Sequence, residues 1–140
     1  MISELFTANV ILGILASGIR LATPYLYAAI GETFGQRSGV LNLGVEGQML
    51  LGAFAGFYMT FTTGSPWLGL LAAILVGALM GLVMGFITVT LHAEQGISGI
   101  GIFLFGLGMS DLLFQKTIGS VETVKGFQPV HIPVLSDLPV

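Results

Sequence analysis

The chain has 140 residues, of which 54% are hydrophobic and only 8% carry a charged side chain. A typical soluble domain has about 25% charged residues, so this composition excludes an ordinary soluble globular protein. The 4 Lys and Arg residues are too few for the clustered basic surface that nucleic-acid binding requires. There is no cysteine, which excludes disulfides and thiolate metal sites.

The first hydrophobic stretch covers residues 5–30 and holds one charged side chain beyond its start, Arg20. A helix needs about 20 mostly apolar residues to cross the hydrocarbon core of a membrane, so this stretch predicts a first span. Pro24 is compatible with such a helix where neighbouring groups satisfy the freed backbone carbonyl. Residues 32–43 are polar and rich in turn-forming residues, and they predict a loop.

The next hydrophobic region is long enough for two spans. Residues 47–93 contain no Asp, Glu, Lys or Arg, and a turn sequence at 62–66 divides them. This pattern predicts spans at 45–61 and 67–91, with Trp67 at a membrane interface. A polar loop at 92–96 precedes a further predicted span at 97–114.

Residues 117–140 contain Pro129, Pro133 and Pro139 and no helical periodicity, so they predict an extended tail at the membrane surface. The fold class expected for residues 1–140 is therefore all-α: a single polytopic transmembrane helix bundle with about four spans. Such a bundle has the tail and the 62–66 turn on one side, and the 32–43 and 92–96 loops on the other. The few basic residues do not orient it in the membrane.

Small residues recur every four positions along the 67–91 span, at Gly77, Gly81 and Gly85, with Gly69 and Ala73 continuing the row. Residues four apart share one helix face, and small faces let membrane helices approach closely. This pattern predicts a helix-packing face. The alternative is chance recurrence in a glycine-rich chain.

Three ionisable residues lie in or beside the predicted spans: Arg20, Glu46 and Asp111. An ionisable group at membrane depth is costly and usually faces a partner or a water-filled cavity. Arg20 could instead extend toward the interface. Glu46 suits the first turn of a helix, where the helix dipole favours a carboxylate. Asp111 near the end of its span could be an ordinary interfacial acid.

The chain lacks the sequence features of common catalytic and metal sites. No phosphate-binding glycine loop with its Lys is present, and no serine lies in a nucleophile elbow. His92 and His131 are isolated and lack metal-ligand spacing. The sequence therefore predicts no catalytic residue, no metal site and no cofactor bound by this chain, which is not expected to be an enzyme.

One stretch carries a specific resemblance. Residues 37–49 read RSGVLNLGVEGQM, and the segments at 22–26, 64–67, 95–99 and 126–129 support the same comparison. The chain resembles the permease subunits of bacterial ABC importers. It is most similar to the simple sugar and nucleoside branch of the branched-chain amino acid and ribose-type permeases. The motif positions are Arg37, Gly39, Asn42, Gly44, Glu46 and Gly47.

The resemblance implies the transmembrane subunit of an ATP-driven importer in the bacterial cytoplasmic membrane, moving a nucleoside or simple sugar. The expected partners are membrane lipid, an ATP-binding subunit that holds the ATP, a second permease subunit and an extracellular solute-binding protein. Asn42, Glu46 and Asp111 are candidates for the solute path, whereas Gly39, Gly44 and Gly47 would serve backbone geometry and close packing. The tail would lie outside and the 32–43 and 92–96 loops inside.

The family is about twice as long as this chain, which resembles its amino-terminal half, so a partial domain is expected. Two alternatives to the importer subunit stay open. One is a truncated, non-transporting helix bundle or assembly partner. The other is a small proton-coupled transporter that uses Arg20 and Asp111, which would need paired intramembrane charges and internal repeats.

Overall fold

The computed structural model describes residues 7–120 and 123–128, and within them the secondary structure is entirely helical. The elements in chain order are α1 (Ala8–Arg37), α2 (Val45–Thr63), α3 (Pro66–Gly85), the π-helix η2 (Phe86–Thr90) and α4 (Gln95–Thr117). The expected all-α fold is confirmed. The chain divides into two units, one of residues 31–127 and one of residues 1–30 with 128–140.

Helix α1 continues into the first half of the polar stretch 32–43 that the sequence predicted as a loop, and residues 38–43 are non-helical as predicted. It ends at Arg37, beyond the predicted end at residue 30. Polar side chains do not break a helix when they bond along it, and Gln36 Nε2 donates to Glu32 Oε1 one turn earlier, at 3.1 Å. The helix ends before Gly39, whose φ of +87° is a conformation that glycine adopts without strain.

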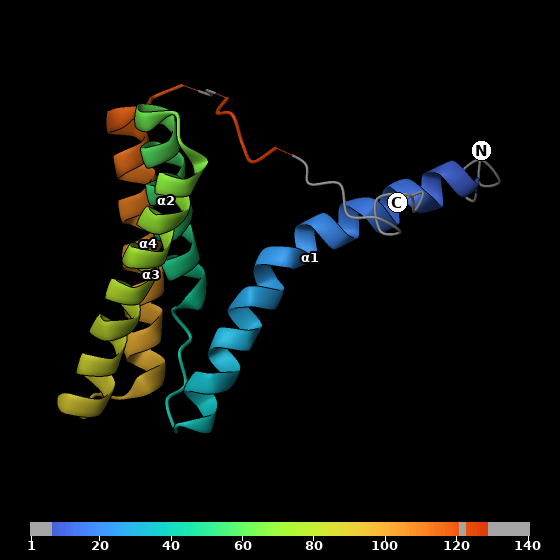
Figure 1. Cartoon of the computed structure of the whole chain (residues 1–140). Coiled ribbons are helices and arrows are strands. Elements are labelled where there is room, and N and C mark those ends of the chain that lie inside the picture. Colours follow the sequence, from blue (N-terminus) through green and yellow to red (C-terminus); the bar gives the residue numbers. More distant parts are fainter. Residues whose placement is uncertain (1–6, 121–122, 129–140) are drawn as a thin grey trace. The chain divides into compact units, whose positions relative to one another are not determined.

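The turn between α2 and α3 lies where the sequence predicted it. Gly64 at the end of α2 has a φ of +70° and donates its N–H to the Thr60 carbonyl oxygen at 2.8 Å. Pro66 then occupies the first turn of α3, where its missing N–H costs nothing. Two elements thus end and begin within three residues, and this brings α2 and α3 together as antiparallel neighbours (Figure 1).

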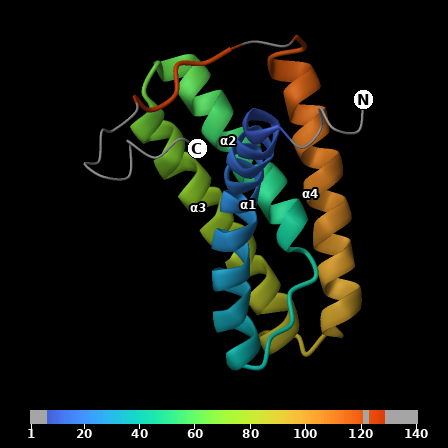
Figure 2. The same ribbon diagram turned by 90° about the vertical axis from the view of Figure 1, so that its right-hand side faces the viewer.

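In the 31–127 unit, α2, α3 and α4 stand side by side, and α2 packs against both of the others (Figures 1 and 2). The buried core is small. It consists of Leu51 from α2, Met80 and Met84 from α3, and Ile102 from α4. Most other large apolar side chains of these helices are exposed, for example Leu82 at 72%. Outward-facing apolar side chains are what a helix bundle surrounded by lipid or further helices requires.

Among the described residues, three helical segments are long and apolar enough to cross a membrane: Val10–Arg37, Pro66–Thr90 and Gln95–Thr117. The second includes η2, so the predicted span at 67–91 is helical almost to its end but changes to a π-helix after Gly85. The helix predicted at 45–61 is present as α2. It carries Glu46, Gln48 and several threonines and is not among these three segments, and its crossing of the membrane stays a prediction.

The start of the predicted tail follows α4 without regular structure over 123–128. Phe127 packs edge-on against Trp67 with ring centroids 5.0 Å apart, so the tail begins at the same end of the unit as the 62–66 turn. The sequence likewise predicted that the tail and the 62–66 turn lie on the same side of the bundle. The tail prolines, Pro129, Pro133 and Pro139, lie outside the described residues.

Candidate functional site

The motif at 37–49 forms the connection from α1 into α2, and Asn42 organises it. Its side-chain oxygen accepts from the Gly44 N–H at 3.0 Å, and its amide nitrogen donates to Gln48 Oε1 at 3.1 Å. Its backbone N–H donates to Glu32 Oε1 at 3.0 Å. An Asn side chain that bonds two residues ahead is a common way to fix a turn. Both polar atoms of this amide are engaged inside the connection, and a place for Asn42 on the solute path stays a prediction.

A second loop is tied to the same connection by one side chain. Gln95, the first residue of α4, accepts from the Leu41 N–H at 2.7 Å and donates to the Gly39 carbonyl oxygen at 3.0 Å. The primary amide thus pairs with the backbone on both of its edges, which fixes α4 relative to the entry of α2. The 32–43 and 92–96 loops therefore lie at one end of the 31–127 unit, as the sequence predicted.

Glu94 begins α4 by accepting hydrogen bonds from the Gly96 N–H at 2.9 Å and from the Ile97 N–H. These side-chain caps satisfy backbone donors that the first helical turn leaves free. The bond from Ile97 and then that from Gly96 hold the pKa of the Glu94 carboxyl below its usual value. The start of α4 is consequently defined by two adjacent residues, Glu94 and Gln95.

Helices α2 and α4 approach so closely that their backbones touch. A Cβ on Gly47 would lie 2.7 Å from Cα of Phe103, and one on Gly44 would lie 2.8 Å from the Gly99 carbonyl oxygen. On α4, a Cβ on Gly106 would lie 2.5 Å from the carbonyl carbon of Gly47. Real side chains do not fit at such distances, so these positions require glycine. The motif glycines Gly44 and Gly47 therefore lie at close contacts between α2 and α4.

The glycine row on α3 behaves differently. Gly69 faces α2, where a Cβ would lie 2.7 Å from the Gly56 carbonyl oxygen. Gly77, Gly81 and Gly85 have no heavy atom within 4 Å of the position that a Cβ would occupy. Of the three, Gly81 is exposed and Gly77 and Gly85 are half-buried. Packing at Gly77, Gly81 and Gly85 therefore stays a prediction.

Asp111 lies on an open groove of about 470 Å³ between α2 and α4. Its Oδ2 accepts from Gln115 Nε2 at 2.7 Å, one helical turn further along α4. Among the described residues this is the carboxylate's only hydrogen bond. The groove is lined by Leu50, Ala53, Phe54, Phe57, Leu107, Ser110, Asp111 and Phe114.

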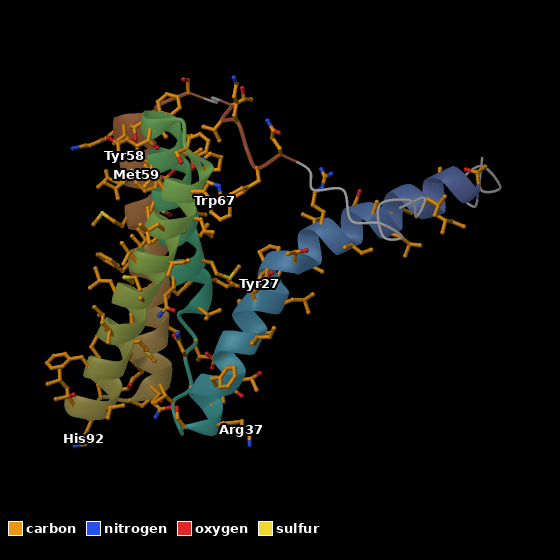
Figure 3. The ribbon with its side chains drawn as sticks, viewed as in Figure 1. Tyr27, Arg37, Tyr58, Met59, Trp67 and His92 are labelled. Carbon is orange, nitrogen blue, oxygen red and sulfur yellow. The ribbon has the colours of Figure 1, made fainter. Side chains whose placement is uncertain are left out.

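The other charged candidates lie apart from this groove. Glu46 is exposed in the first turn of α2, and Arg37 is exposed at the end of α1. Figure 3 shows Arg37 and His92 at one end of the 31–127 unit, and Tyr58, Met59 and Trp67 toward the other. Arg20 lies in the other unit, and no described carboxylate pairs with it. The structure thus brings together Asn42 with the motif loop and Asp111 with aromatic rings, and it does not gather the three path candidates into one site.

Sequence reasoning missed two groups of residues. Glu32, Gln48 and Gln95 complete the polar connection, and the aromatic residues Phe54, Phe57 and Phe114 form the wall beside Asp111. The spacing of Phe54, Phe57 and Phe61 on α2 was a possible signal, because it places phenyl rings along one helix face. Within residues 7–120 and 123–128, no group of three metal-ligating side chains gathers.

The fold and the site together define a polytopic membrane protein whose helices are held by backbone contacts and polar loops. Residues 14–137 match the family described as branched-chain amino acid transport system / permease component. The chain belongs to this family, as its resemblance predicted. The family is one of transport permeases and not an enzyme class. With its three apolar helices, the chain is a multi-pass protein of the plasma membrane.

Three relatives show how far the similarity extends. The chain is 37% identical over 123 residues to a putative glucose ABC transporter permease of Haloferax volcanii, covering 88% of the chain and 37% of the relative. It is 36% identical over 128 residues to a guanosine permease of Bacillus subtilis, covering 85% of the chain and 40% of the relative. It is 31% identical over 135 residues to a nucleoside permease of Lactococcus lactis, covering 91% of the chain and 43% of the relative.

The chain therefore spans about two fifths of the length of these curated relatives. No solved structure matches it.

Proposed function

We propose that this chain forms part of the transmembrane subunit of an ATP-driven importer for a small polar solute, either a nucleoside or a simple sugar. The observation that carries the proposal is the match of residues 14–137 to a transport permease family, together with relatives named for guanosine, nucleoside and glucose transport. The membrane-spanning helices and the open groove beside Asp111 suit such a role.

The division of labour within the importer follows from what the chain holds. It has no phosphate-binding loop, so a separate ATP-binding subunit would bind and hydrolyse ATP. A second permease subunit would complete the path, and an extracellular binding protein would deliver the solute. The chain's own part is alternating access, in which packed helices move around a central route.

The close backbone contacts favour motion of α2 and α4 as one body. Where Gly47 and Gly106 meet, the two backbones are in direct contact, and close packing of this kind drives the association of membrane helices. The two hydrogen bonds of the Gln95 side chain with Leu41 and Gly39, referred to below as the Gln95 clamp, hold α4 to the loop that leads into α2. A rigid pair of this kind can transmit force from a partner subunit along its whole length.

Uptake into proteoliposomes tests the proposal. The protein would be purified from its own membrane with all subunits that accompany it, and guanosine or glucose would be supplied outside the vesicles. We expect accumulation that requires ATP and is indifferent to an imposed pH gradient. Accumulation driven by the gradient alone would instead support the proton-coupled alternative. No accumulation under either condition would support the non-transporting alternative.

A further inference from the structure

The groove between α2 and α4 combines aromatic surface with a single acidic group. Phe57 from α2 and Phe114 from α4 meet at its wall, with ring centroids 6.2 Å apart and planes inclined by 50°. Phe54 lies one turn before Phe57 and stacks on Tyr58 at 5.8 Å. These contacts hold the phenyl rings in place, so the groove presents a firm aromatic surface for a flat apolar ligand.

Asp111 supplies the groove's charge. It precedes the end of α4 at Thr117 by six residues, a distance of about 9 Å along a helix. Gln115 holds the carboxylate through Oδ2, and the other oxygen has no hydrogen bond from a described residue. A carboxylate at membrane depth is unfavourable against lipid tails. The groove therefore suits a ligand that donates hydrogen bonds better than it suits an acyl chain.

The remaining polar groups limit which ligand fits. Ser110 Oγ is already bonded to the Leu107 carbonyl oxygen at 3.0 Å, and every other lining residue besides Asp111 is apolar. A sugar carries hydroxyls all around its ring and would leave most of them without partners here. A nucleobase has two apolar faces and one edge of donors and acceptors. It matches a groove with aromatic walls and one acceptor.

Building on the proposed transport function, we propose that this groove binds the purine base of a nucleoside, with guanine preferred. The guanine edge carries two adjacent donors, N1–H and the 2-amino group, which a carboxylate can accept together. One face of the base would lie against the wall that Phe57 and Phe114 form, as bases stack on aromatic side chains elsewhere. Hypoxanthine lacks the 2-amino donor, and adenine presents an acceptor at N1, so both fit less well.

Equilibrium binding to the purified complex in nanodiscs tests this assignment without any variant. We expect guanosine to bind more tightly than inosine by about tenfold, the loss typical of one hydrogen bond to a charged group. Adenosine and glucose should bind more weakly still. Equal binding of guanosine and inosine, or binding of glucose alone, would overturn the assignment.

Two variants locate the site. Asp111→Asn keeps the size of the side chain and removes its charge, and should weaken guanosine binding by about tenfold while narrowing its preference over inosine. Phe114→Leu should weaken both nucleosides alike because it removes a stacking face. Its control is Phe105→Leu on the same helix, because Phe105 is exposed and does not line the groove.

The outcomes separate this inference from the proposed function. ATP-dependent uptake of guanosine that neither Asp111→Asn nor Phe114→Leu alters would overturn the groove and leave the importer standing. A second pair of results would also overturn the groove as a purine site: Asp111→Asn loses its partner subunits, and the unchanged protein binds guanosine and inosine equally. Together these results would mean that a neighbouring helix covers the groove. Absence of any ATP-dependent uptake in the unchanged protein would overturn the proposed function itself.

Discussion

Two sets of glycines in this chain differ in whether another helix backbone lies against them. Gly44 and Gly47 at the start of α2 meet Gly99 and Gly106 on α4, with their backbones in direct contact. In the row of Gly77, Gly81 and Gly85 on α3, no heavy atom of a described residue lies within 4 Å of the positions that Cβ atoms would occupy.

In a membrane, apolar side chains gain little by leaving lipid for one another, so close van der Waals packing drives helix association. The covered row shows this packing completed within the chain. The open row offers the same smooth surface without a partner among the described residues, beside exposed side chains such as Leu75 and Leu82. Glycine at every fourth position predicts a helix face that another helix can approach closely. The tertiary structure determines whether a helix of the same chain packs on that face.

The largest expected effect is at the covered row. Gly106→Ala would put a methyl group 2.6 Å from Cα of Gly47, where only backbone could yield. We expect a loss of about 1–3 kcal/mol in the free energy of unfolding, the usual cost of overpacking. Unfolding in detergent micelles, followed by helical circular dichroism, measures this loss.

Gly101→Ala is the matched control, because Gly101 lies on the same helix and no heavy atom lies within 4 Å of its Cβ position. It should be neutral or slightly stabilising, since alanine favours helix more than glycine does. Equal losses in the two variants would mean that the α2–α4 contact does not depend on the missing side chain.

A smaller effect is expected at the polar end of the same contact. Gln95→Ala removes the bond accepted from Leu41 and the bond donated to Gly39. Each hydrogen bond contributes about 0.5–1.5 kcal/mol, and exposure of this amide favours the lower figure. Gln95→Glu keeps the acceptor and loses the donor, so its free energy of unfolding should lie between those of the alanine variant and the unchanged protein. If both variants match the unchanged protein, the Gln95 clamp does not hold α4 on α2.

These contacts also show what the sequence could and could not predict. The lengths of the hydrophobic stretches and the 62–66 turn were enough to predict α2, α3 and α4, because both signals depend on local composition. The end of α1 was misplaced, because Glu32 and Gln36 look like a loop by polarity and yet bond along a helix.

The site was less predictable for a different reason. Asp111 could be singled out as a charge in an apolar helix, but its aromatic neighbours Phe54 and Phe57 come from α2, more than 50 residues earlier. Gln95 likewise contacts Gly39 and Leu41 across more than 50 positions. Such pairings arise from how helices pack, and no local pattern carries them.

The smallest effect on the fold is expected at the open row, where it is most informative. No heavy atom lies within 4 Å of the Cβ position of Gly81, so Gly81→Leu should not lower the free energy of unfolding and should raise it slightly, because leucine favours helix more than glycine does. If the row packs against another part of the assembly, the same variant should abolish co-purification of partner subunits and ATP-dependent uptake at normal expression. Ala78→Leu is the control, an exposed small residue of α3 outside the row. Unchanged assembly and uptake in Gly81→Leu would mean that lipid alone covers this face, and that its spacing arose by chance.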